Sequence, residues 1–148
     1  MYLVSSCLAG VNCRYDGGNN ENNIICELVR LGKAIAVCPE QSGGLSTPRP
    51  GCEIVTDESG KTKVVTKDGE DYTKEFIEGS EKTLVIAKKI GARMAIFKAK
   101  SPSCGCGFIY DGTFSSKLIK GNGLTTELLV KNGIKVYTEI DLDKLQLL

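Results

Sequence analysis

The chain of 148 residues contains no histidine and no tryptophan, and only 6% of its residues are aromatic. Without histidine there is no Ser-His-Asp triad, no Cys-His pair and no imidazole ligand for zinc. Any proton transfer in catalysis must therefore use carboxylates, lysines, tyrosines or water. The scarcity of aromatic rings also leaves little material for stacking the bases of a single-stranded nucleic acid.

The chain also has no large excess of positive or negative charge, because 19 basic and 18 acidic residues leave a net charge of +1. Proteins that bind nucleic acids or membrane surfaces usually carry a basic patch, so we expect neither partner. No apolar run approaches the ~20 residues of a membrane span. The N-terminal residues MYLVSSCLAG lack the basic segment of a signal peptide. We expect a cytoplasmic protein, and these features do not indicate its oligomeric state.

The chain has seven cysteines, too few for a disulfide scaffold, in which cysteine exceeds about 8–10% of the residues. Their odd number and the expected cytoplasmic location favour reduced thiols. Some of these thiols are therefore candidates for metal binding or catalysis.

Short apolar runs alternate with amphipathic segments along the chain. The runs predict strands at 2–6, 34–37, 94–97 and 135–137. The amphipathic segments predict helices at 20–32, 71–90 and 124–132, with a short helix from Asp141 to Leu148. This alternation predicts a single three-layer α/β domain over residues 1–148, with a mostly parallel, Rossmann- or flavodoxin-like sheet. The expected strand order is second, first, third, fourth.

Two segments rich in proline and glycine interrupt this pattern. Residues 39–53 contain three prolines and three glycines, so we expect no regular structure there. Residues 99–107 form the second such loop, and residues 54–66 predict a small β-hairpin insertion. Long loops in compact domains are usually functional, and ligands of such sheets bind beyond the carboxyl ends of the strands.

Cys7, Cys38 and Cys104 each follow one of the predicted strands. Neighbouring strands lie about 4.8 Å apart, so side chains at three adjacent strand ends can converge within about 10 Å. Three thiolates without histidine favour an iron–sulfur cluster or zinc, with one coordination position left open. The alternative is that these cysteines are small buried hydrophobic residues.

The other four cysteines have weaker claims to a metal. Cys26 lies on the apolar face of a predicted helix and is expected in the core. Cys13 and Cys52 lie in loops that can approach the same edge of the sheet. Cys106 is too close to Cys104 for an easy structural disulfide, although the two thiols could form a redox pair.

Polar residues accompany the three cysteines. Glu40 follows Cys38 and Pro39 and is either a functional carboxylate or a solvated loop residue. Ser101 and Ser103 precede Cys104 and place hydroxyls beside its thiol. Further candidates stand in two loops: Asp16 and Arg14, which could equally form an ion pair that braces a turn, and Arg49, which could meet an anion or a carboxylate.

Six ordered motifs resemble those of the thiouracil desulfidase family, also classified as domain of unknown function 523. They cover nearly the whole chain and stand at residues 4–10, 14–17, 38–40, 43–50, 101–105 and 110–114. The resemblance implies a [4Fe–4S] cluster bound by Cys7, Cys38 and Cys104, with the fourth iron free for the sulfur of a thiolated nucleobase. Such a cluster is expected to be lost readily when the protein is purified in air.

The same resemblance implies that Glu40 is the active-site carboxylate and Ser101 the active-site serine. Ser103, Asp16 and Arg49 are then candidates for binding the base. The implied reaction is redox-neutral, converting thiouracil and water into uracil and hydrogen sulfide. We therefore expect a small thiolated base as the partner.

Two other functions remain open. The first is a non-catalytic iron–sulfur or thiol redox sensor, although the sequence lacks an obvious DNA-binding element. The second is a metal-free thiol enzyme that uses Cys104 and Cys106 as nucleophile and resolving thiol. That mechanism leaves Cys7 and Cys38 without a role.

Overall fold

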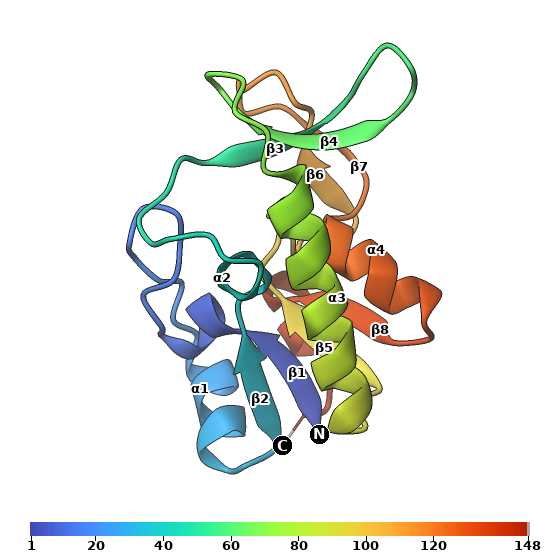
Figure 1. Cartoon of the computed structure of the whole chain (residues 1–148). Coiled ribbons are helices and arrows are strands. Elements are labelled where there is room, and N and C mark those ends of the chain that lie inside the picture. The colour runs from blue at the N-terminus through green and yellow to red at the C-terminus, as the bar shows by residue number, and fades with distance from the viewer. Residues whose placement is uncertain (148) are drawn as a thin grey trace.

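The computed structural model describes residues 1–147, and its centre is a parallel sheet (Figure 1). Four strands form it: β1 (Tyr2–Ser5), β2 (Ala34–Val37), β5 (Met94–Phe97) and β8 (Lys135–Thr138). Their order across the sheet is β2-β1-β5-β8, and each neighbouring pair is parallel. The predicted order of second, first, third, fourth strand is therefore confirmed.

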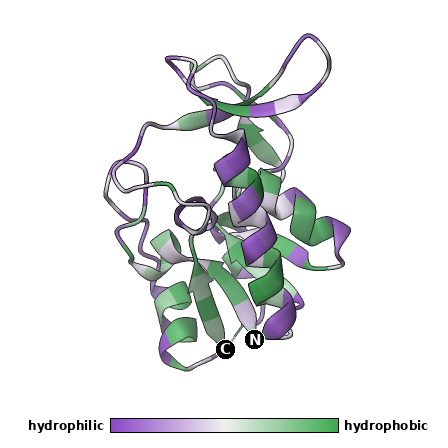
Figure 2. Ribbon diagram, viewed as in Figure 1, coloured by the Kyte–Doolittle hydropathy of each residue, from purple (hydrophilic) through white to green (hydrophobic). Residues whose placement is uncertain are grey.

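Helices cover both faces of this sheet, which confirms the predicted three-layer α/β architecture. The helices α3 (Thr73–Lys89) and α4 (Leu124–Lys131) pack on one face. The helix α1 (Asn23–Arg30) and the 3-10 helix η2 (Glu139–Lys144) pack on the other. Because both faces are covered, the strands are hydrophobic over most of their length (Figure 2).

The side chains of successive residues in a central strand point to opposite faces of the sheet. Leu3 of β1 and Phe97 of β5 pack under α3 and α4, whereas Val4 and Ile96 pack under α1 and η2. These four side chains are fully buried. The apolar runs read from the sequence thus supply two cores rather than one.

Three helices begin at residues other than the predicted ones, among them α3, which begins at Thr73 rather than at Asp71. Asn22 caps α1, since its side chain accepts hydrogen bonds from the backbone N–H groups of Ile24 and Ile25, at 3.0 and 3.3 Å. The predicted start at Asn20 is too early because the Asn20 side chain instead binds Arg14. Near the C-terminus, Thr138 caps η2 and the predicted cap Asp141 closes a capping box. Leu148, the end of that predicted helix, lies outside the described residues.

Two antiparallel hairpins lie beyond the carboxyl ends of the parallel strands (Figure 1). The first joins β3 (Cys52–Thr56) to β4 (Thr62–Thr66) and confirms the predicted insertion. The second joins β6 (Phe108–Tyr110) to β7 (Leu118–Lys120). This second hairpin is not predicted from the sequence, because the three residues of β7 are all exposed and give no buried face.

The segment 39–53, expected to be irregular, contains the one-turn helix α2 (Pro39–Ser42) and the start of β3. Pro39 occupies the first turn, where its missing N–H costs nothing. The helix crosses α3 at two glycines. A Cβ on Gly79 would lie 1.9 Å from the Pro39 carbonyl oxygen, and one on Gly43 would lie 1.9 Å from that of Glu75.

Gly79→Ala is therefore expected to destabilise the protein. Alanine favours a helix over glycine by about 1 kcal/mol, but here its methyl group meets backbone that cannot rotate away. Overpacking of this kind costs about 1–3 kcal/mol, so we expect a net loss in the free energy of unfolding, measured in urea. Glu78→Ala, at the exposed neighbouring position, should unfold like the parent. A Gly79→Ala protein as stable as the parent would contradict this crossing.

Candidate active site

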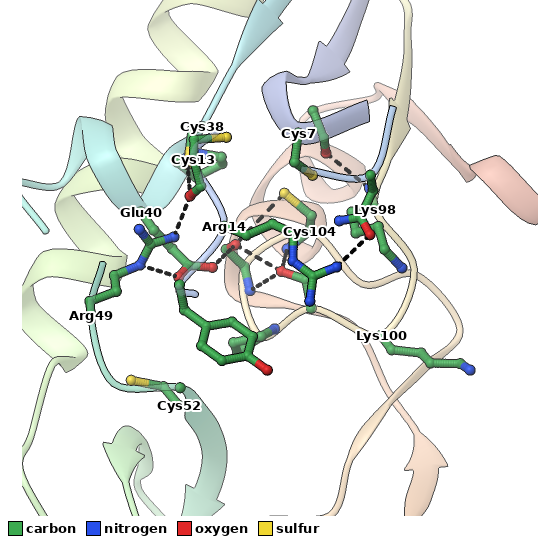
Figure 3. Close-up of a pocket in the computed structure, with 18 of the residues that line it drawn as sticks. Cys7, Cys13, Arg14, Cys38, Glu40, Arg49, Cys52, Lys98, Lys100 and Cys104 are labelled. Carbon is green, nitrogen blue, oxygen red and sulfur yellow. Dashed lines mark hydrogen bonds and ion pairs between the residues drawn. The ribbon is translucent and has the colours of Figure 1, made fainter. Parts of the chain in front are cut away.

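A cavity of about 620 Å³ opens at the carboxyl edge of the sheet (Figure 3). It collects segments from β1, β2, the loop after β5 and both hairpins. Of the eight residues predicted as cluster ligands, catalytic groups or base-binding groups, seven line it: Cys7, Cys38, Glu40, Arg49, Ser101, Ser103 and Cys104. These residues are distant in sequence, so only the fold brings them together.

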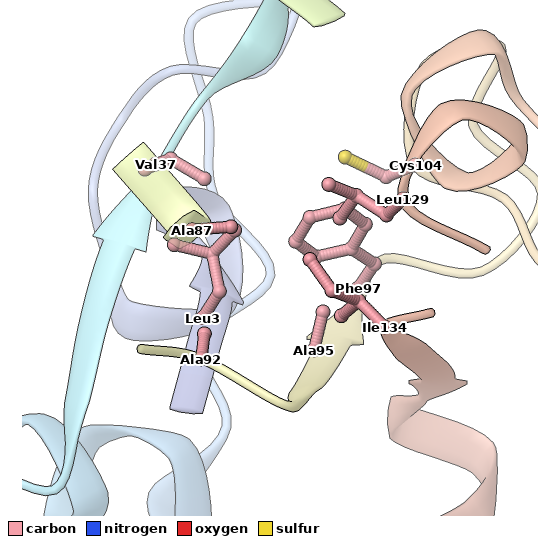
Figure 4. Packing of buried hydrophobic residues seen from close by; sticks show 9 residues of the cluster. All are labelled: Leu3, Val37, Ala87, Ala92, Ala95, Phe97, Cys104, Leu129 and Ile134. Atoms are coloured by element: carbon pink, nitrogen blue, oxygen red, sulfur yellow. The ribbon is translucent and has the colours of Figure 1, made fainter. Parts of the chain in front are cut away.

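Three different elements supply the three predicted cysteine ligands. Cys7 lies in the 3-10 helix η1 (Ser6–Ala9), which directly follows β1. Cys38 follows β2 and caps α2. Cys104 lies in the loop after β5, and its side chain also packs in the core beside Phe97 and Leu129 (Figure 4).

Cys13, which the sequence places in a loop that can approach this edge of the sheet, does reach the cavity. It is 2% exposed and lies beside Cys38 in the cavity wall (Figure 3). The thiols of Cys7 and Cys38 are each a possible hydrogen-bond partner for the single Cys13 proton, and this lowers the pKa of Cys7 and of Cys38 to about 7, against the opposing effect of burial. Hydrogen bonding of this proton to Cys38 or Cys7 raises the pKa of Cys13 far above its ordinary value. A thiolate is thus accessible near neutral pH at Cys7 or Cys38, while Cys13 stays protonated.

Burial has the largest effect on the pKa of Cys52, Cys104 and Cys106. It raises the pKa of Cys104, which is 4% exposed, well above its ordinary value. Burial likewise raises the pKa of Cys52, at the cavity wall, to about 12. Cys106 is not part of the lining, and its thiol donates to the Val136 carbonyl at 3.4 Å. This placement gives no support to Cys104 and Cys106 as nucleophile and resolving thiol.

The arrangement of the thiols bears on which metal group they fit. Within residues 1–147, no three His, Cys, Asp or Glu side chains are placed to hold a metal ion. A zinc site needs its ligands around one ion, at about 2.3 Å for sulfur. The cysteines of an iron–sulfur cluster bind separate irons and stand further apart. Three thiols around one cavity therefore fit a cluster better than a zinc ion.

Glu40 is held by hydrogen bonds at both carboxylate oxygens. Arg49 Nε donates to Oε1 at 3.1 Å, and Ser103 Oγ donates to Oε2 at 2.7 Å. The side chain of Glu40 is 15% exposed and that of Arg49 is 5% exposed. Arg49 also donates to the Cys13 and Ser46 carbonyls, at 2.9 and 3.1 Å. Arg49 thus meets a carboxylate, one of its two expected partners, and orients it.

A short chain of hydroxyls leads away from Glu40. Ser103 Oγ lies 3.0 Å from Ser101 Oγ and 3.7 Å from the Cys104 sulfur. Ser101 Oγ in turn accepts hydrogen bonds from the backbone N–H groups of Ser103 and Cys104, at 3.2 and 3.0 Å. The two serines therefore connect the carboxylate to the thiol side of the cavity.

Asp16 is placed differently from the other candidates, because it is not among the residues that line the cavity. Its carboxylate accepts from the Gly18 N–H at 2.9 Å and pairs with Arg14 at 3.1 Å. The Gly18 hydrogen bond, with a smaller effect of Arg14, lowers the pKa of Asp16. Asp16 thus braces an exposed turn, the alternative reading of this motif, while Arg14 faces the cavity.

Thiols and a hydrogen-bonded carboxylate line one cavity at the carboxyl edge of a parallel sheet. These features define the class of the protein: an α/β protein whose pocket is of the kind that binds a cofactor and carries out catalysis. Residues 2–141 match the family model described as 2-thiouracil desulfurase, and the chain belongs to this family. The resemblance read from the six motifs is therefore confirmed.

Two relatives show how far the similarity extends. The chain is 49% identical over 148 residues to "Uncharacterized protein YbbK" of Bacillus subtilis (strain 168), covering 97% of this chain and 98% of that protein. Among solved structures, it resembles the "[4Fe-4S]-dependent thiouracil desulfidase TudS (DUF523Vcz)" with a TM-score of 0.88 and 43% identity. That match covers 97% of this chain and 93% of the other.

Proposed function

We propose that this chain is a [4Fe–4S]-dependent desulfidase that removes sulfur from a small thiolated nucleobase such as thiouracil. The observation that carries the proposal is the braced carboxylate of Glu40 in the same cavity as the thiols of Cys7, Cys38 and Cys104. The family match and the similarity to a solved structure of a [4Fe-4S]-dependent thiouracil desulfidase support it.

Cys7, Cys38 and Cys104 are the proposed cluster ligands. When bound, the cluster supplies a Lewis-acidic iron that takes the sulfur of the substrate and polarises its C–S bond. Three protein ligands leave this iron without a protein partner. Cys13 lies beside two of the three ligands, and its single proton can hydrogen-bond to the sulfur of Cys7 or of Cys38.

Glu40 is the proposed general base. It accepts a proton from the water that attacks the ring carbon, while Arg49 and Ser103 hold both carboxylate oxygens in place. A C–O bond forms and the C–S bond breaks, and sulfur leaves as hydrogen sulfide after taking up the protons of the water. The Ser101 hydroxyl, connected to Glu40 through Ser103, is placed to hydrogen-bond the base and relay a proton.

This reaction needs no electron donor, because the carbon of a C=S group and that of a C=O group have the same oxidation state. A non-catalytic redox sensor, the alternative function, would give the ion pair of Glu40 with Arg49 and the serine chain no role. Turnover by the cluster-loaded protein separates the two functions.

The proposed partner is a small molecule rather than a nucleic acid or a membrane, and the proposed location is the cytoplasm. Cavities of about 300–1,000 Å³ typically enclose small ligands, and this one measures about 620 Å³. Within residues 1–147, no helix has the length and apolar character to cross a bilayer. All seven cysteines are free, and a reducing compartment keeps thiols available for iron.

Sulfide release from different substrates tests the proposal. Protein reconstituted with iron and sulfide without oxygen should release sulfide from free thiouracil with no added reductant. The same protein stripped of metal by a chelator should release none, and thiolated tRNA should be a poor substrate. Release that depends on a reductant, or that occurs from tRNA alone, would overturn the proposal.

A further inference from the structure

The loop 111–116 between β6 and β7 is held in one conformation by its own polar groups. The Asp111 N–H donates to the Lys117 carbonyl at 2.9 Å. The Asp111 carboxylate accepts from the Thr113 N–H at 2.9 Å and from the Thr113 hydroxyl at 2.6 Å. This motif is part of the family resemblance, yet none of the chemistry described above uses it.

The other hairpin holds the loop 111–116 as well. Glu53 of β3 accepts from the backbone N–H groups of Gly112 and Phe114, at 3.0 and 3.2 Å, through one carboxylate oxygen. Gly112 has a φ of +90°, and a Cβ there would lie 2.8 Å from the Ile54 carbonyl oxygen. The loop 111–116 thus packs closely against β3 and is held there by the Glu53 carboxylate.

Phe114 itself has a backbone conformation that a bulky residue rarely adopts. Within residues 1–147, the non-glycine residues with positive φ are Lys100, Phe114 and Ser116, at 70°, 56° and 62°. Lys100 and Phe114 both line the cavity. Such conformations persist where the surroundings enforce them, and they are concentrated at ligand-binding sites.

We propose that Phe114 is the aromatic ring on which the flat thiolated base stacks, and that Glu53 is its positioning residue. The identity of the ligand as a base rests on the proposed function. Phe114 is half-buried and lines the same cavity as Glu40. Tyr15 also lines it, but that side chain is 48% exposed and the Arg14 guanidinium stands over its ring at 5.8 Å. Tyr110 lines the cavity from β6, and of these three aromatic residues Phe114 is the one with a positive φ.

Kinetics provide the first test. Phe114→Leu keeps an apolar side chain and removes the ring, so KM for thiouracil should rise about tenfold with kcat nearly unchanged. Phe114→Tyr should keep the parent KM. Glu53→Ala should raise KM in the same way, and Glu53→Gln should restore it, because the amide oxygen still accepts from both N–H groups. Iron content should be the parent's in all four variants. An unchanged KM in Phe114→Leu would overturn the proposal.

Binding provides a test that needs no turnover. Because the chain has no tryptophan, Phe114→Trp introduces a single tryptophan, and thiouracil and uracil should quench its selectively excited fluorescence saturably. Phe108→Trp is the matched control, since Phe108 is 52% exposed and lies outside the cavity lining. Quenching without any sulfide release would support the stacking site and refute the desulfidase function. Equal quenching of the two variants, or turnover without quenching of Phe114→Trp, would overturn the stacking site.

Discussion

Alanine at Cys7, Cys38 or Cys104 is expected to abolish cluster binding, whichever of the three is changed. Anaerobically reconstituted parent protein should hold about four irons per chain, and each variant should retain little iron or acid-labile sulfide. The reason is that the three thiols enter one cavity from three separate elements, so each supplies a position that the other two cannot fill. Iron and sulfide assays, with the visible absorbance of the protein, measure the outcome.

Cys106→Ala is the matched control for these variants, because its thiol lies outside the cavity lining and binds the Val136 carbonyl. It should keep both iron and turnover, whereas a nucleophile-and-resolver mechanism predicts that it loses activity. Thermal unfolding of the metal-free variants shows whether each still folds. This control matters most for Cys104→Ala, because the Cys104 side chain packs in the core. A full cluster in any one of the three ligand variants would contradict the assignment.

Glu40→Gln is expected to lower turnover by about 10²–10⁴-fold, the usual contribution of a general base, while the cluster content stays at the parent level. The substitution removes the proton acceptor and keeps the shape of the side chain. The amide oxygen can still accept from Arg49, and the Ser103 hydroxyl can rotate to accept from the amide nitrogen. The loss should therefore appear in kcat at saturating thiouracil.

Glu78→Gln serves as the carboxylate control, since Glu78 lies exposed on α3 and outside the cavity lining. Its turnover should equal that of the parent. If cluster-loaded Glu40→Gln turned over at the parent rate, another group would have to remove the proton. The location of Asp16 outside the lining makes it a poor replacement.

The parallel sheet was predictable from the sequence because its strands are buried on both faces. Leu3 and Val4 serve opposite cores, so the strand appears as an uninterrupted apolar run. The helix α2 was not predictable, since it has four residues and lies among prolines and glycines that usually break helices. Its stability comes from the glycine crossing with α3, a contact between segments about forty residues apart.

Some residues of the site were likewise predictable from the sequence, and others were not. Cys7 and Cys38 follow strands, so the topology of a parallel sheet places them at one edge. Cys13 has no such signal, and its location beside both thiols depends on how the loop after η1 folds back. Glu53 and Phe114 belong to two hairpins, and only the docking of one hairpin on the other brings the carboxylate to the loop.

The origin of the product oxygen tests the central claim most directly. Reconstituted protein is incubated with 2-thiouracil in heavy-oxygen water, without oxygen and without a reductant. The account predicts that each thiouracil consumed gives one labelled uracil and one hydrogen sulfide. Loss of thiouracil without labelled uracil, or no reaction until an electron donor is added, would contradict it.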